Sequence, residues 1–431
     1  MSSNAKTTAM KSNAKPALTP KLRFPEFQNA PAWEATTIGE LGSFYYGKSA
    51  PKWSLEADAP TKCVRYGELY TKFGVTVTET YSRTNIDPAS LRFSKGGEIL
   101  VPRVGEKPED FGKCCCYLPL ANIAIGEMIS VFETVQNPLF YTYYFRLLYR
   151  EFSKVVEGQN VKNLYYTELE PLPIHRPGIP EQQKIADCLT SVDELIAAQG
   201  RKVDALKTHK KGLMQQLFPG EGESQPRLRF PEFQDAGEWE ERKLGTVCEI
   251  QRGRFSHRPR NDPKFFGGKY PFIQTGDVVK SEGGAIIGSQ SLNEDGLAVS
   301  KLFKPTIVLI TIAANIGDTG LLQTEGCFTD SVAGLIPKRE VIPVFLELIM
   351  RGQKEYLNKV ATTGAQKNIN NEILREVNIL LPTAREQQRI ADCLTSLDNL
   401  VDAQTQKLDA LKTHKKGLMQ LLFPASDEVE A

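Results

Sequence analysis

Two long stretches of the chain carry apolar residues at alternating steps of four and three, which is the spacing of a helix that packs along a seam. One stretch runs from Ile185 to Leu217 and the other from Ile390 to Leu422. Prolines flank both stretches and none interrupts them: Pro180, Pro219, Pro382 and Pro424. The pattern predicts two long coiled-coil helices, at residues 179–219 and 382–424.

The apolar seam positions of the two helices correspond one to one. Those of the first helix are Ile185, Leu189, Val192, Ile196, Val203, Leu206, Leu213 and Leu217. Those of the second helix are Ile390, Leu394, Leu397, Val401, Leu408, Leu411, Leu418 and Leu422. Polar residues at the remaining seam positions set the register or face a partner more than they add stability: Gln199, Lys210, Gln404 and Lys415. A helix of about 37 residues is roughly 55 Å long. Its apolar seam must be buried, and the helix of the other copy is the partner of equal length. A surface helix on its own domain is the alternative.

The two helices close two copies of an internal repeat. Residues 20–34 match residues 226–240 at 11 of 15 positions, and residues 181–219 match residues 386–424 at 30 of 39 positions. The sequences between these matching segments diverge almost completely. A solenoid repeats every 20 to 50 residues or so. Two copies of this length therefore indicate two whole domains with a pseudo-twofold relation.

The divergent inserts combine strand and helix patterns. Apolar β-branched runs predict strands at Gly96–Val101 and Thr306–Ile312, and Tyr270–Val279 predicts a strand followed by a turn. A proline in the first turn predicts helices at Pro138–Tyr149 and Pro343–Arg351. The expected fold class is α+β, with two mixed-sheet domains separated by the two long helices.

The repeat also gives the expected domain boundaries. They are a disordered N-terminal tail at 1–20, a first domain at 21–178, a first coiled-coil helix at 179–219, a polar linker at 220–227, a second domain at 228–381, a second coiled-coil helix at 382–424 and an acidic C-terminal tail at 425–431. The first 20 residues contain no acidic residue and no apolar core, so they are more typical of a disordered tail than of a secretory signal. We therefore expect a cytoplasmic protein.

Composition excludes some classes of protein. The chain has 431 residues, 53 Lys+Arg and 52 Asp+Glu, which is the length of two or three domains. No apolar stretch approaches the roughly 20 residues that cross a bilayer, so we expect no membrane partner. The net charge of +1 leaves a nucleic-acid partner open, because phosphate binding depends on a local basic surface.

No motif in the chain is sufficient for catalysis or for a metal site. The segment Gly42–Ser49 matches a phosphate-binding loop, but Pro51 follows it at once and the second copy lacks the pattern. The segment Asn137–Phe140 approaches the tetrapeptide of amino-methyltransferases but lacks its second proline, and it is a helix start. Cys114–Cys116 are adjacent and have no second cluster at zinc spacing. We assign no catalytic residue and no metal ligand.

Basic segments of the inserts are the best binding candidates. The segment Arg252–Lys264 has five Arg/Lys and one Asp, and its prolines favour a loop. Arg and Lys can pair with guanine, and Asn and Gln with adenine, although any one such residue is more often merely exposed. The candidates in the first insert are Lys48, Arg65, Tyr66, Arg103, Gln159, Asn160 and Lys162. Those in the second insert are Arg252, Arg254, His257, Arg258, Arg260, Lys264, Gln366, Lys367 and Asn368.

Several repeated motifs together point to a known family. They are LRFPEF at Leu22–Phe27 and Leu228–Phe233, Trp33 and Trp239, EQQ-IADCLTS from Glu181 and Glu386, and LKTHKKGLMQ-LFP at the end of each copy. In tandem around dissimilar inserts, these motifs resemble the DNA-specificity subunits of type I restriction-modification systems over nearly the full chain.

The resemblance implies a non-catalytic subunit that binds double-stranded DNA. Each insert would be a target-recognition domain reading one half of a bipartite site, and the helices would form an antiparallel coiled coil that sets the spacer. The implied partners are two methyltransferase (modification) subunits, which carry S-adenosylmethionine and methylate adenine, and restriction subunits, which use ATP and Mg²⁺ to translocate and cleave DNA. No cofactor is expected on this chain.

Two other functions remain open from the sequence. A protein-protein scaffold would show no salt-dependent binding to duplex DNA. A self-contained modification enzyme would transfer methyl groups without partners. For partner binding, the expected surface is the exposed face of the helices near Lys207, Lys210, Lys211, Lys412, Lys415 and Lys416.

Overall fold

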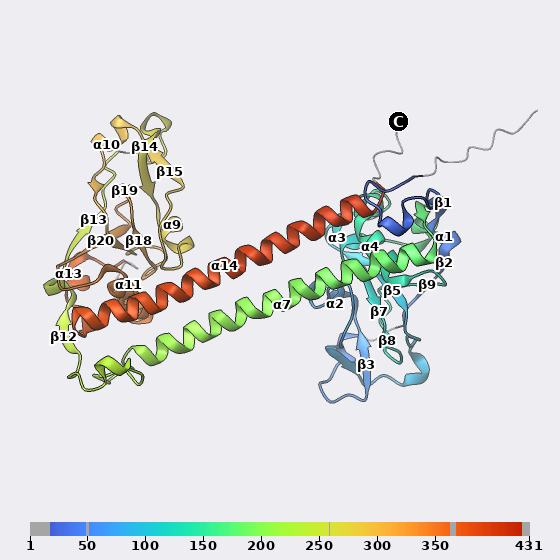
Figure 1. Cartoon of the computed structure of the whole chain (residues 1–431), viewed down its shortest axis with the longest axis horizontal. Coiled ribbons are helices and arrows are strands. Elements are labelled where there is room, and N and C mark those ends of the chain that lie inside the picture. Colours follow the sequence, from blue (N-terminus) through green and yellow to red (C-terminus); the bar gives the residue numbers. More distant parts are fainter. Residues whose placement is uncertain (1–17, 49–50, 258, 363–367, 425–431) are drawn as a thin grey trace, which may run out of the picture. The chain divides into compact units, whose positions relative to one another are not determined.

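The computed structural model describes residues 18–48, 51–257, 259–362 and 368–424 (Figure 1). The chain divides into two compact units. Unit 1 contains the chain up to Gly200 and from Gln406 onward, and unit 2 contains Arg201–Thr405. Each unit therefore contains one insert and half of each long helix. The tails expected at 1–20 and 425–431 lie outside the described residues, except for residues 18–20.

Two helices of 39 residues dominate the chain, α7 (Ile179–Leu217) and α14 (Ala384–Leu422). All sixteen apolar seam residues named above are buried or half-buried in these helices. Pro180 lies in the first turn of α7 rather than before it, where its missing N–H costs no hydrogen bond.

Within each unit the two helix halves run antiparallel. In unit 1, the start of α7 shares a core with the end of α14, through Ile185 and Leu422. Further along, Lys415 Nζ donates to both carboxylate oxygens of Asp193 at 2.5 and 2.7 Å. In unit 2, the matching residues Lys210 and Asp398 form the equivalent ion pair. The polar seam lysines are thus each neutralised by the opposite helix.

The insert of unit 1 is built on two small sheets. An antiparallel sheet has the order β2 (Gly42–Tyr46), β9 (Ile129–Thr134), β5 (Glu98–Pro102), β7 (Cys116–Leu118). A mixed sheet has the order β4 (Ser82–Thr84), β3 (Thr61–Val64), β8 (Ala124–Ile125), with β3 and β8 parallel. Two-stranded pairs are β1 (Glu34–Thr37) with β11 (Pro173–Arg176) and β6 (Val104–Gly105) with β10 (Lys162–Asn163). The helices are α1 (Ile38–Leu41), α2 (Tyr66–Thr71), α3 (Pro108–Lys113), α4 (Pro138–Leu147), α5 (Tyr149–Lys154) and α6 (Tyr166–Leu169).

The insert of unit 2 has the same plan. An antiparallel sheet has the order β13 (Cys248–Arg252), β20 (Val332–Pro337), β17 (Ile307–Thr311), β18 (Thr319–Leu322). A mixed sheet has the order β15 (Gln290–Leu292), β14 (Phe266–Ile273), β19 (Gly326–Phe328), β16 (Leu302–Phe303). A further pair is β12 (Glu240–Lys243) with β21 (Asn378–Leu381). The helices are α8 (Leu244–Val247), α9 (Thr275–Lys280), α10 (Glu294–Ala298), α11 (Pro343–Gly352), α12 (Lys354–Thr362) and α13 (Asn371–Arg375).

The predicted α+β fold class is confirmed, with one local correction. The turn expected after the strand in Tyr270–Val279 is wrong, because the chain forms helix α9 there. The Gln274 N–H donates to the Asp277 carboxylate at 2.9 Å, which caps the first turn of this helix. A helix so short has too little periodicity to be seen in the sequence.

The repeated motifs build the same core in both units. In unit 1, Phe423, just after α14, packs against Trp33 and Phe140. In unit 2, Phe218, just after α7, packs in the same way against Trp239 and Phe345. The end of each long helix is therefore part of the core of a unit, which explains why the same residues close both copies.

A buried ion pair ties the opening motif of each copy to its helix. Arg23 donates to both carboxylate oxygens of Glu181, at 2.8 and 2.6 Å. Arg229 makes the same two bonds to Glu386, both at 2.8 Å. We call these two pairs the arginine staples. They give the LRFPEF and EQQ motifs a structural role in each unit.

Candidate nucleic-acid interface

The segments that follow four strands of unit 1 are joined by backbone hydrogen bonds. These strands are β2, β3, β5 and β8. The bonds run from Lys48 N–H to Ile125 C=O (2.9 Å), from Gly126 N–H to Val64 C=O (3.0 Å) and from Arg103 N–H to Met128 C=O (3.0 Å). We call this cluster of segments the strand-end surface of unit 1. It brings together candidate residues that lie far apart in the sequence.

Unit 2 has an equivalent strand-end surface. Its bonds run from Thr329 N–H to Ile273 C=O (3.3 Å), from Ile312 N–H to Ser331 C=O (3.0 Å) and from Ile369 N–H to Ile312 C=O (2.9 Å), the last matching Leu164 N–H to Arg103 C=O (2.9 Å) in unit 1. These bonds align the two units residue by residue. The aligned pairs include Lys48 with Arg254, Arg65 with Gln274 and Arg103 with Ile312.

The glycine before Lys48 or Arg254 is required by close packing. A Cβ on Gly47 would overlap the carbonyl oxygens of Gly126 and Ile125. A Cβ on Gly253 would overlap the carbonyl oxygens of the matching segment, at Thr329 and Phe328. The glycine-cation pair that recurs in the sequence therefore marks a point where two strand-end segments touch.

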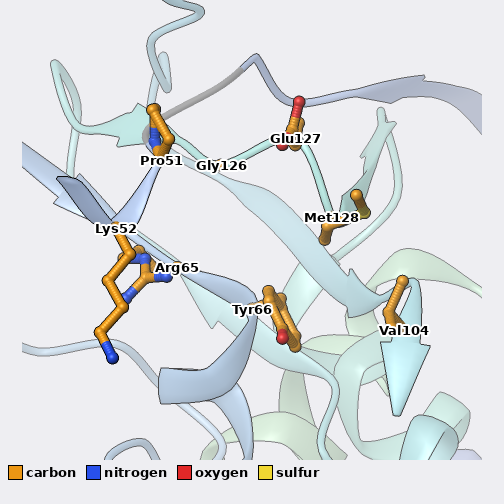
Figure 2. Close-up of a pocket in the computed structure, with 8 residues that line it drawn as sticks. All are labelled: Pro51, Lys52, Arg65, Tyr66, Val104, Gly126, Glu127 and Met128. Carbon is orange, nitrogen blue, oxygen red and sulfur yellow. The ribbon is translucent and has the colours of Figure 1, made fainter. Parts of the chain in front are cut away.

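A pocket of about 310 Å³ opens on the strand-end surface of unit 1. Figure 2 shows Lys52 and Arg65 on one side of it and Val104 on the other, with Tyr66 between them. Its remaining lining residues are Pro51, Gly126, Glu127 and Met128. The candidates Arg65 and Tyr66 thus line one concave surface.

Arg103 lies between two aromatic rings beside this pocket. Its guanidinium carbon is 4.5 Å from the ring centroid of Tyr46 and 5.4 Å from that of Tyr165. Such contacts attract a cation to the ring face. Burial raises the pKa of Tyr46, so its ring stays neutral at neutral pH.

The remaining candidates of unit 1 lie on the surface. Lys48, Gln159 and Asn160 are exposed. Lys162 is half-buried in β10 and donates to the Gly158 carbonyl oxygen at 2.6 Å. Because β10 pairs with β6, which follows Arg103, this loop borders the strand-end surface.

In unit 2, several cations of the basic segment are bonded within the protein itself. Arg252 donates to the main-chain oxygen of Asp330, and Arg260 pairs with the Asp330 carboxylate at 2.7 Å. His257 and Lys264 both lie within 3.5 Å of the carboxylate of Asp262. The main-chain N–H of Lys264 donates to this carboxylate and lowers the pKa of Asp262, which keeps it ionised.

The other candidates of unit 2 either lie on the surface or fall outside the described residues. Arg254 is exposed and donates to the Ser300 carbonyl oxygen at 2.9 Å. Asn368 is exposed and pairs with Ala313, next to Ile312 on the strand-end surface. Arg258, Gln366 and Lys367 lie outside the described residues.

Trp53 was not among the residues predicted from the sequence, yet it is 76% exposed in the short 3-10 helix Lys52–Ser54. Buried Ser54 holds this turn, since its hydroxyl lies 2.7 Å from the Pro51 carbonyl oxygen and 2.8 Å from the Thr84 hydroxyl. A signal was present in the sequence, because Trp33 and Trp239 recur in the repeat whereas Trp53 does not.

Two of the six lysines expected on the exposed helix surface are not exposed. The side chains of Lys210 and Lys415 are only 16% and 17% exposed, and each is ion-paired to an aspartate of the opposite helix. Burial next to Asp193 lowers the pKa of Lys415 despite the pair. The other four lysines are exposed: Lys207, Lys211, Lys412 and Lys416.

The described residues offer no other site with obvious chemistry. Among them, no group of three or more His, Cys, Asp and Glu side chains could hold a metal ion. Burial raises the pKa of Cys116 to about 12, so this thiol is protonated and belongs to the core. None of the described helices combines the length and apolar character needed to cross a bilayer.

Comparisons with known proteins agree with this architecture. A type I restriction enzyme specificity subunit from Methanocaldococcus jannaschii, MjaVIII, is 24% identical over 450 residues, covering 95% of each chain. The S subunit of a type I restriction-modification system from M. genitalium has the same fold, with a TM-score of 0.59, 15% identity and coverage of 95% of this chain and 100% of that one. A structure of a type I system solved to explain complex assembly and conformational transition gives a TM-score of 0.56 at 18% identity, covering 92% and 98%.

The family assignment rests on a sequence model. The model of the type I restriction modification DNA specificity domain matches residues 113–208 and 236–413, which together are more than half of the chain. Both matched ranges contain the end of an insert and most of a long helix. The chain therefore belongs to the family of type I restriction-modification specificity subunits, the non-catalytic subunits that give these complexes their DNA specificity.

Proposed function

We propose that each unit reads one half of a bipartite site in double-stranded DNA through its strand-end surface. The observation that carries this proposal is the residue-by-residue alignment of the two surfaces. Their backbone bonds correspond, whereas the side chains that they present differ: Lys48 and Arg254, Arg65 and Gln274, Arg103 and Ile312. One framework with two sets of side chains is what two different half-sites require.

The long helices are proposed to set the spacer between the half-sites. Both helices are continuous over 39 residues, and each passes from one unit into the other. The Lys415–Asp193 and Lys210–Asp398 pairs fix the register of the seam, since a shift of either helix would leave a lysine without its carboxylate. A rigid connection makes spacer length part of the specificity.

The proposed protein partners are two methyltransferase subunits, with restriction subunits in the full complex. The two long helices present the same exposed side chains once in each unit. These are Ser191, Leu195 and Ala198 in unit 1 and Ser396, Leu400 and Ala403 in unit 2. Two equal surfaces suit two equal partners. S-adenosylmethionine, ATP and Mg²⁺ would be bound by those partners, and the complex would act in the cytoplasm.

The proposal is tested by sequencing adenine methylation in the host genome with and without this gene. We expect the loss of one bipartite motif with a fixed spacer. An unchanged methylome, together with the absence of salt-dependent binding to duplex DNA, would instead favour a protein-protein scaffold. Methyl transfer by the purified chain without partners would favour a self-contained enzyme.

Trp53 provides a direct signal for DNA binding by unit 1. It is the one exposed tryptophan of the three in the sequence, since Trp33 and Trp239 are buried. We expect target DNA to protect its fluorescence from acrylamide quenching. The variant Trp53→Phe should lose this protection yet keep its affinity. The variant Trp53→Ala should bind more weakly by about 1–3 kcal/mol, as for aromatic rings that stack on bases. Equal quenching with and without DNA would place Trp53 outside the interface.

A further inference from the structure

The guanidinium of Arg103 is held rigidly at the strand-end surface of unit 1. Its main-chain N–H and C=O are both bonded, to Met128 and Leu164. Its side chain lies against Tyr46, the last residue of β2, and against Tyr165, the residue before α6. Backbone and side chain are thus fixed together, so little conformational entropy remains to be lost on binding a ligand.

The hydrogen-bonding capacity of this side chain is largely unused. Arg103 Nε is buried and has no hydrogen-bond partner among the described residues. The two terminal nitrogens are not buried in this way, and no acceptor among the described residues hydrogen-bonds to them. A fixed, charged donor edge therefore faces solvent beside the pocket.

We propose that Arg103 reads a guanine in the half-site bound by unit 1. Two parallel N–H groups of the guanidinium match the O6 and N7 acceptors that guanine presents in the major groove. The contact is charge-assisted and bidentate, which makes it strong and directional. This inference rests on the proposed function, because it requires the strand-end surface of unit 1 to contact duplex DNA.

A base contact fits Arg103 better than a phosphate contact does. Lys48 and Lys52 are exposed, flexible cations around the same surface, and such residues suffice to neutralise phosphates. Discrimination between bases instead needs donors at fixed positions. The two rings around Arg103 provide that fixation, whereas a phosphate contact would not require it.

The matching position of unit 2 cannot make this contact. It is occupied by Ile312, which is fully buried. The position that matches Tyr46 holds Arg252, which is bound to the main-chain oxygen of Asp330. The guanine contact proposed for Arg103 should therefore have no counterpart at the matching position of unit 2.

The test is a selection of random duplexes by the complete complex of this chain with its methyltransferase partners. Arg103→Lys keeps the charge but loses the bidentate geometry, and Arg103→Met fills the space between the rings without any donor. For both variants we expect the preference for one G·C pair to fall about 5- to 150-fold, which corresponds to one bidentate base contact. The other half-site should be selected as in the wild type, which also reports that the variant complex is assembled.

The matched control is Arg83→Lys. The Arg83 guanidinium already donates to the main-chain oxygens of Ala59 and Pro60, so this variant should leave the motif unchanged. If Arg103→Lys weakens binding equally for all sequences, Arg103 contacts a phosphate and the inference is wrong. The inference is also wrong if both Arg103 variants keep the wild-type motif. A wild-type complex that selects no bipartite motif would contradict the proposed function itself, before any variant is compared.

Discussion

Replacing Glu386 with alanine is expected to lower the free energy of unfolding of unit 2 by about 3–5 kcal/mol, because the variant leaves a buried guanidinium without its counter-charge. The side chains of Arg229 and Glu386 are only 8% and 1% exposed. Arg229 would keep only its bonds to the main-chain oxygens of Ala236 and Gly237. Trp239 Nε1, 3.4 Å from the same carboxylate, would lose its acceptor as well.

The control for this prediction is Glu232→Ala in the same unit. Glu232 pairs with Arg389 at 3.1 Å, but the two side chains are 38% and 47% exposed. Exposed pairs contribute about 0–1 kcal/mol, so this variant should be nearly as stable as the wild type. Urea titrations followed by circular dichroism measure both changes. Equal midpoints for the two variants would show that the arginine staple contributes no more than a surface ion pair.

The arginine staples show what the repeat in the sequence could and could not reveal. The repeated motifs were visible because both copies keep the same residues, and the heptad pattern predicted the long helices. The partnership of Arg229 with Glu386 was not visible, because the two residues are 157 positions apart. Local periodicity predicts helices, whereas pairs this distant depend on how the whole domain packs.

The candidate DNA-binding residues illustrate the same limit. The basic segment Arg252–Lys264 has a local charge of +4 in the sequence. In the fold, Asp330 lies against Arg252 and Arg260 although it is 70 residues beyond Arg260. A charge count along the chain cannot include such a partner, because β-sheet pairing brings it in from elsewhere.

Arg103, by contrast, is inconspicuous in the sequence and distinctive in the fold. In the sequence it is one cation among many, and nothing near it indicates a special role. Its two aromatic neighbours come from positions 46 and 165, which the pairing of β2, β9 and β5 and of β6 and β10 brings to the same edge. The sequence could predict that the inserts carry binding residues, but only the sheet register distinguishes a clamped guanidinium from an exposed one.

The exposed side chains that recur on the two long helices are expected to control assembly of the complex. Leu195 and Leu400 occupy matching positions and are 56% and 42% exposed. We expect Leu195→Asp to remove one methyltransferase subunit from the complex and Leu400→Asp to remove the other. A partner docked there would bury the new carboxylate without a counter-charge, at a cost of about 3–5 kcal/mol, or more than 100-fold in affinity. The double variant should bind neither subunit.

Native mass spectrometry of the reconstituted complex counts the bound subunits directly. Ile287→Asp is the matched control, because Ile287 is also an exposed apolar residue but belongs to the insert of unit 2 and to neither long helix. Two subunits bound to the double variant would exclude this face. Charge reversal at the exposed Lys207 and Lys412 tests the basic part of the helix surface separately from the apolar part. These lysines lie about three turns beyond Leu195 and Leu400 along their helices. If the leucine variants lose partners and the lysine variants keep them, docking depends on the small apolar face and not on the basic one.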